Sequence, residues 1–148
     1  MRRVALYGTL AAALVTGGNL LHGLSHAGGG VPLVAWQQAY VLLVIFLAPS
    51  AAALLLWGRF RRAGAWLLVV SMAGALVFGL AYHFLIPGPD NALTLQPGAW
   101  RPVFRASAAL LVIMDALGLA AGLWALDRLS RAPSETGSAS GIAQTEVR

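Results

Sequence analysis

Four long runs of apolar residues, separated by short polar or glycine-rich segments, dominate the pattern along the chain. Each run is close to the length of about 20 residues that an α-helix needs to cross the hydrocarbon core of a bilayer. Apolar runs of this length predict transmembrane helices. The predicted helices cover residues 4–27, 34–57, 65–86 and 104–126.

The connections between the predicted helices differ in length. Residues 28–33, which begin with three glycines, and residues 58–64 are short links, whereas residues 87–103 form a long loop with four prolines. The sequence therefore predicts an all-α domain over residues 1–127, an up-and-down bundle of four transmembrane helices. Residues 128–148 are rich in Ser, Thr and Gly, and we expect them to form a disordered cytoplasmic tail.

The composition supports a membrane location. Hydrophobic residues make up 59% of the 148 residues, charged residues only 10%, and the mean hydropathy is +0.75. A soluble domain of this size would need more charged residues to cover its surface. The chain has no cysteine, which excludes disulfides, thiolate metal sites, iron–sulfur clusters and cysteine nucleophiles.

The net charge of +5 is carried by arginine, because the chain contains no lysine. The arginines stand in short clusters beside the apolar runs, so the lipid bilayer is the expected partner and nucleic acid is not. Of the arginines beside these runs, Arg101 and Arg105 fall on one side of the predicted topology, and seven fall on the other. Because arginine is enriched on the cytoplasmic side, both termini are predicted to be cytoplasmic in a multi-pass protein of the cell membrane. The seven are Arg2, Arg3, Arg59, Arg61, Arg62, Arg128 and Arg131.

The first apolar run has an alternative interpretation. Two arginines, an apolar stretch and the small residues Ser25 and Ala27 around His26 together resemble a signal peptide with its cleavage site. However, Asn19 and His22 interrupt the stretch, and the run is long enough to span a bilayer. We favour a retained first helix. Cleavage of residues 1–27 would leave the rest of the topology unchanged.

The first predicted helix has two different faces. At 100° per residue, its leucines gather on one side, which is typical of contact with lipid. Small and polar residues share the opposite stripe, which predicts contact with the other helices. The stripe consists of Gly8, Ala12, Asn19, His22, Gly23 and His26.

The fourth predicted helix carries an acidic residue near its middle. Asp115 shares a stripe with Ala108, Gly118 and Gly122. An ionised carboxylate at this depth costs about 2.5–3.5 kcal/mol, so we expect Asp115 to be protonated and hydrogen-bonded to a neighbour, either for function or to fix helix packing. The Gly118–Gly122 pair permits close helix approach, and association with a second copy or with other membrane subunits is predicted through these two glycines.

Polar residues from separate segments lie near the predicted outer ends of the helices. Counted at about 1.5 Å per residue, three histidines reach a similar depth. Imidazole is a good ligand for Zn, Cu or Fe, so these histidines are candidate metal ligands: His22, His26 and His83. The wider candidate ligand-binding set adds Asn19, Gln37, Asp90 and Asp115.

Several interpretations of this cluster stay open at the level of sequence. A single histidine at this depth is typical of an interfacial side chain with an apolar body and a wet tip. Two facing histidines could hold a haem, and a polar cluster could bind a quinone, a lipid or another small ligand. The sequence does not identify a cofactor.

Two function classes fit these patterns. The first is a membrane protein that binds a metal, cofactor or small molecule in an outer pocket lined by histidine. The second is a structural or accessory subunit of a larger membrane complex, without a ligand of its own. An enzyme is not favoured, because the sequence contains no recognisable nucleophile–base arrangement.

Overall fold

The computed structural model describes residues 1–131, and within them all regular structure is helical. Four helical spans are long and apolar enough to cross a membrane, as a multi-pass membrane protein requires. The predicted all-α fold is thereby confirmed. The first span is α1 (Arg2–Gly29), and the second consists of α2 (Ala35–Tyr40), η1 (Val41–Leu47) and α3 (Ala48–Trp57). The third consists of α4 (Arg61–Leu80) and η2 (Ala81–Leu85), and the fourth is α5 (Arg101–Ser130).

The helices extend beyond the predicted apolar runs at most of their ends. Three of them begin at arginines, Arg2, Arg61 and Arg101, because backbone hydrogen bonding continues where hydropathy has already fallen. The last helix continues to Ser130, three residues into the predicted tail. Its final turn is held by an ion pair between Arg131 and Asp127, whose nitrogen and oxygen are 2.8 Å apart. Residues 132–148 of the predicted tail lie outside the described residues.

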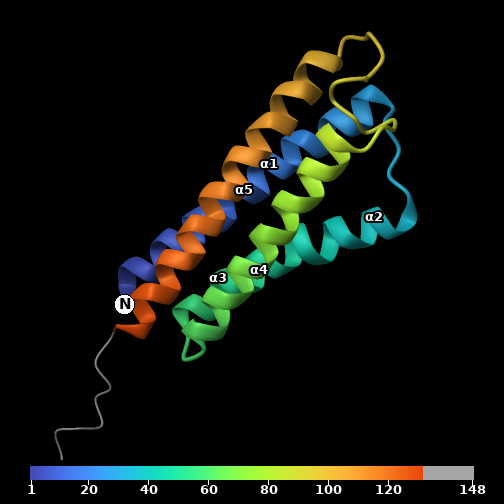
Figure 1. Ribbon diagram of the computed structural model, residues 1–148. Helices are drawn as coiled ribbons and strands as arrows, with labels where there is room; N and C mark the ends of the chain where they lie inside the picture. The colour runs from blue at the N-terminus through green and yellow to red at the C-terminus, as the bar shows by residue number, and fades with distance from the viewer. Residues whose placement is uncertain (132–148) are drawn as a thin grey trace, which may run out of the picture.

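The four spans pack unequally. Helix α5 packs along both α1 and α4, and α3 packs against α4 and α1. Figure 1 shows the second span diverging from α1 as it runs from α3 towards α2. Because η1 has few contacts with α1, the bundle is tight at the end that carries the N-terminus and open on one side towards the other end.

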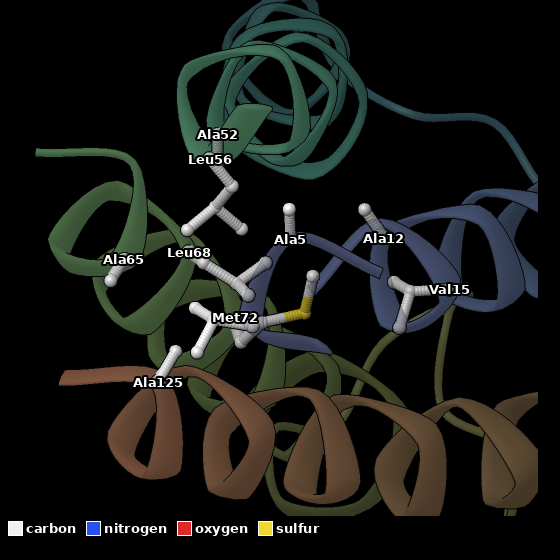
Figure 2. Packing of buried hydrophobic residues seen from close by; sticks show 10 residues of the cluster. Ala5, Ala12, Val15, Ala52, Leu56, Ala65, Leu68, Met72 and Ala125 are labelled. Carbon is white, nitrogen blue, oxygen red and sulfur yellow. The ribbon is translucent and has the colours of Figure 1, made fainter. Parts of the chain in front are cut away.

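Small side chains allow close packing at the tight end of the bundle. The buried cluster in Figure 2 draws residues from α1, α3, α4 and α5, and Leu56 of α3 and Leu68 of α4 are fully buried in it. Alanines complete the contacts between the larger side chains: Ala5, Ala12, Ala52, Ala65 and Ala125. This packing stabilises the end of the bundle that carries the N-terminus.

The predicted faces of the first helix are largely confirmed. Leu10, Leu14 and the other leucines on the predicted lipid face are exposed. The exception is Gly23, which is exposed. An added side-chain carbon there would meet no atom of the described chain within 4 Å, whereas the same carbon on Gly18 would meet the Met114 sulfur at 2.9 Å. The expectation that Gly23 packs against another helix was therefore wrong, and Gly18 has this role.

Gly118 and Gly122 lie against α4 of the same chain. A side-chain carbon on Gly118 would come within 2.7 Å of the Met72 sulfur, and one on Gly122 within 2.8 Å of a Val69 methyl group. These two glycines therefore bring α5 close to α4. Association with other subunits stays a prediction, and the contacts of these glycines within the chain do not favour them as its surface.

Candidate metal centre

Three histidine side chains converge at the end of the bundle opposite the N-terminus. His22 and His26 lie one turn apart on α1, and His83 comes from η2. The Nε2 atom of His22 is 3.1 Å from Nε2 of His26 and 3.1 Å from Nε2 of His83. All three residues are buried, and their candidate ligand atoms lie within 4.8 Å of one another. The structure thus brings together the three histidines that sequence placed only at a common depth.

A π-helical turn positions His83. In η2 the Ile86 amide donates to the Ala81 carbonyl, five residues earlier, at 2.7 Å. Such wide turns occur frequently at functional sites because they redirect side chains. The His83 carbonyl accepts a hydrogen bond from the Ala92 amide at 2.8 Å, which holds the following loop over the histidines.

The hydrogen bonds of two imidazoles identify where each carries its proton. Nδ1 of His26 lies 3.1 Å from the Val31 carbonyl oxygen, and Nδ1 of His83 lies 3.1 Å from the Asp90 carbonyl oxygen. A carbonyl oxygen only accepts hydrogen bonds, so both Nδ1 atoms donate. In a neutral imidazole this leaves the lone pair on Nε2, which points into the cluster.

The same conclusion holds for His22 through Ser107 of α5. The Ser107 hydroxyl donates to the Phe104 carbonyl at 3.1 Å, so its only hydrogen is used there. Its oxygen, 2.9 Å from Nδ1 of His22, then accepts a hydrogen bond from that nitrogen. With each Nδ1 beside an oxygen acceptor, the Nε2 atoms of the three imidazoles are left as the candidate ligand atoms, and these atoms lie close together. If a metal ion were bound here, the Nε2 atoms of His22, His26 and His83 would hold it, with their Nδ1 atoms oriented by the oxygen acceptors.

Asp90 adds a carboxylate beside the histidines. Its Oδ1 lies 3.2 Å from Nε2 of His26 and 3.4 Å from Nδ1 of His83. The side chain is buried, and neither oxygen has a partner with hydrogen-bond geometry among residues 1–131. A buried carboxylate without such partners is costly, and a cation beside it removes that cost.

The loop that carries Asp90 is anchored by its neighbours. Asn91 Oδ1 accepts hydrogen bonds from the amides of Leu93 and Thr94 at 2.9 and 3.3 Å, and Asn91 Nδ2 donates to the Ile86 carbonyl. Arg105 of α5 donates to the Ala92 carbonyl at 2.6 Å. These bonds fix the backbone on both sides of Asp90, so its carboxylate is held in place.

Phe104 forms an apolar wall of the cluster. It is fully buried, and its ring centroid lies 4.8 Å from that of His22, 4.9 Å from that of His26 and 5.7 Å from that of His83. An aromatic ring at this position excludes water from the imidazoles and limits their rotation.

The remaining predicted site residues divide into two groups. Asn19 and Asp115 line a cavity that also touches the three histidines and Asp90. Asp115 Oδ1 is buried without a hydrogen-bond partner in the described part of the chain, so the expected bond from a neighbouring helix is not found for this atom. Gln37 lies outside the lining of the cavity, and its Oε1 accepts a hydrogen bond from the Val34 amide at the start of α2.

The residues that orient the histidines were not predicted from the sequence. Ser107 and Phe104 belong to the fourth span, and in sequence they resemble any small or apolar residue of a membrane helix. The one available signal was their position, within two residues of Arg105 near the start of that span.

Comparison of the chain with protein-family models, with curated proteins and with solved structures finds no match. The chemistry of the site is therefore argued from its own geometry.

Proposed function

We propose that this membrane protein binds a divalent transition-metal ion through His22, His26 and His83, with the Asp90 carboxylate available as a fourth ligand. One observation carries the proposal: three Nε2 atoms lie close together in a buried site while each Nδ1 is beside an oxygen atom. Donation of the second ring nitrogen to a fixed acceptor is the usual arrangement of histidine ligands.

The distances between the histidine nitrogens can be compared with those in a tetrahedral zinc site. Two nitrogens about 2.1 Å from one tetrahedral zinc ion lie about 3.4 Å apart. The Nε2 atoms of His22 and His26, and those of His22 and His83, are 3.1 Å apart, close to this spacing, and the candidate ligand atoms of all three residues lie within 4.8 Å of one another.

The ligand set favours some metals over others. Imidazole nitrogen suits Zn²⁺, Cu²⁺, Fe²⁺ and Ni²⁺, whereas Ca²⁺ and Mg²⁺ prefer shells made of oxygen. Three histidines and one carboxylate, without cysteine, therefore favour a transition-metal ion. Zn²⁺ is the appropriate first probe because it undergoes no redox change.

The test is a zinc titration of the full chain. The protein, purified in mild detergent and stripped with a chelator, is expected to take up one Zn²⁺ per chain in isothermal titration calorimetry and in elemental analysis. His83→Ala should lose this uptake. Gln37→Glu should retain it, since Gln37 lies outside the cavity and glutamate preserves the bond to the Val34 amide. A wild-type protein that takes up no Zn²⁺, Cu²⁺ or Ni²⁺ would refute the proposal.

We further propose that the protein resides in the cell membrane with both termini cytoplasmic. Support comes from the arginine asymmetry and from the two ends of the described chain, which lie at the same end of the bundle (Figure 1). The metal centre would then lie near the outer surface.

Reporter fusions test this topology. A reporter fused after Arg148 is expected to report the cytoplasm, and one inserted between Gly98 and Ala99 is expected to report the opposite side. The insertion point is in the exposed part of the loop between η2 and α5. Finding the two reporters on the same side would contradict the four-span topology.

A further inference from the structure

A cavity of about 550 Å³ adjoins the three histidines. It lies where the second span diverges from α1, and its walls are largely apolar, with Ile45, Phe46 and Phe78 among them. Its volume falls within the range of about 300–1,000 Å³ that is typical of small-molecule sites. Leu20 and Leu24, which are exposed, and Gly23 line it on the α1 side. The exposed leucines place an opening of the cavity on the side of the bundle, beside α1.

Polar groups stand at both ends of this apolar space. The histidine cluster forms one end. Asp115, only 4% exposed, contributes the other, and its Oδ1 has no hydrogen-bond partner among residues 1–131. Ser107, which contacts His22, and Asp115 are eight residues apart on α5, so the two polar levels are separated by about 12 Å along the helix.

We propose that the cavity binds a lipophilic ring compound with an oxygen atom at each end, the chemistry of quinones and quinols. One oxygen faces the histidine cluster and the other hydrogen-bonds to Asp115. The inference rests on the proposed function, because the metal-loaded cluster is the anchor for the first oxygen. It concerns binding alone, and no electron transfer is implied.

Two features favour this occupant over the acyl chain of a lipid. An acyl chain carries polar atoms at one end only, so it would leave Asp115 Oδ1 buried and unpaired, which is costly. A ring compound also matches the aromatic walls that Phe46 and Phe78 provide. Asp115 can serve both oxidation states, since a protonated carboxyl donates to a carbonyl and a carboxylate accepts from a hydroxyl.

A series of three probes tests the two-ended recognition. Zinc-loaded protein in phosphatidylcholine nanodiscs is titrated with tetramethyl-1,4-benzoquinone, with 2,3,5,6-tetramethylphenol, which has one oxygen, and with 1,2,4,5-tetramethylbenzene, which has none. Affinity is expected to fall about tenfold with each oxygen removed, because the loss of one oxygen leaves Asp115 Oδ1 without a partner and the loss of the other leaves the metal-loaded cluster without one. Equal affinities for the quinone and the hydrocarbon would overturn the inference. The inference would also be overturned if oleate displaced the quinone and bound with higher affinity than the quinone. That result would assign the cavity to acyl chains.

Substitutions at Asp115 identify the second anchor. Asp115→Leu should abolish the difference in affinity between the quinone and the phenol, whereas Asp115→Asn, which retains a donor and an acceptor, should preserve most of it. Uptake of one Zn²⁺ serves as the measure of correct folding for both variants. If Asp115→Leu fails this measure, the probe series on the wild-type protein still decides the inference.

Gly23 offers a test of entry from the lipid. It lines the cavity and has open space around it, so Gly23→Leu can be accommodated while it narrows the opening. Quinone affinity is expected to fall about tenfold or more with zinc uptake unchanged, since a filled opening excludes the ring. Gly17→Leu, on the same helix and equally free of neighbours but outside the cavity, is the matched control.

The outcomes separate this inference from the proposed function. Uptake of zinc without preference for the quinone refutes the ring ligand alone. Absence of metal uptake by the wild-type protein refutes the metal centre. An unchanged quinone affinity in Gly23→Leu would contradict entry beside α1.

Discussion

Replacement of His22 by alanine is expected to weaken zinc binding severely. Its Nε2 is the atom that lies 3.1 Å from both of the other Nε2 atoms, so its loss removes a ligand and the contact that joins His26 to His83. Structural zinc sites bind with about 10–16 kcal/mol from four ligands, or about 3 kcal/mol for each. Zinc affinity should therefore fall more than about a hundredfold, as measured by calorimetry on chelator-stripped protein.

Ser107→Ala should cause a smaller loss of zinc affinity, which tests the role of the Ser107 hydroxyl. The substitution leaves all three ligands in place but removes the acceptor that keeps the proton of His22 on Nδ1. Loss of such a partner typically lowers metal affinity by about 10–100-fold. Ser71→Ala is the matched control, because Ser71 is also buried and bonded to a carbonyl of its own helix, at 3.1 Å, but makes no contact with the histidines. Equal zinc affinities for the two serine variants would contradict the proton assignment at His22.

The fold was accessible from the sequence because a bilayer demands long apolar helices, and hydropathy detects them directly. The irregular parts were not accessible in the same way. The π-helical turns at Val41–Leu47 and Ala81–Leu85 depend on backbone hydrogen bonds that leave no mark in hydropathy. Since His83 lies in one of these turns, its direction required the structure.

The error at Gly23 has a geometric origin. The buried positions of α1 follow a repeat of 3.5 residues, as in Val15, Gly18, His22 and Ser25, which is typical of helices that cross at a small angle. A helical wheel drawn at 3.6 residues per turn drifts from this repeat by about 20° in seven residues. By the end of a long helix the wheel therefore placed Gly23 on the packed face instead of the exposed one.

The candidate site illustrates what depth alone can predict. Counting residues from the helix ends correctly grouped His22, His26 and His83, because rise along a helix is constant. It gives no information about rotation around the helix axis. For this reason Gln37, at a similar depth, was included, although its side chain is used to cap α2.

Substitution of Gly64 is expected to have the largest effect on stability. It lies in α4 directly against α3, and a side-chain carbon there would come within 2.9 Å of the Ala52 carbonyl oxygen and 2.9 Å of the Leu56 amide nitrogen. These are backbone atoms of a helix, so they cannot move aside as a flexible side chain would. Gly64→Ala is therefore expected to force α3 and α4 apart and to destabilise the protein by about 1–3 kcal/mol or more.

Gly17→Ala should have an effect of the opposite sign. Gly17 is also within a helix, but no atom of residues 1–131 would lie within 4 Å of an added carbon there. Alanine is favoured over glycine in a helix by about 1 kcal/mol, so this variant should be as stable as the wild type or more stable. Thermal unfolding of both variants in one detergent, followed by circular dichroism, measures the difference. If Gly64→Ala proved as stable as Gly17→Ala, the close contact between α3 and α4 would be wrong. The tight packing at that end of the bundle would then be wrong as well. The divergence of the second span and the opening of the cavity both depend on this packing.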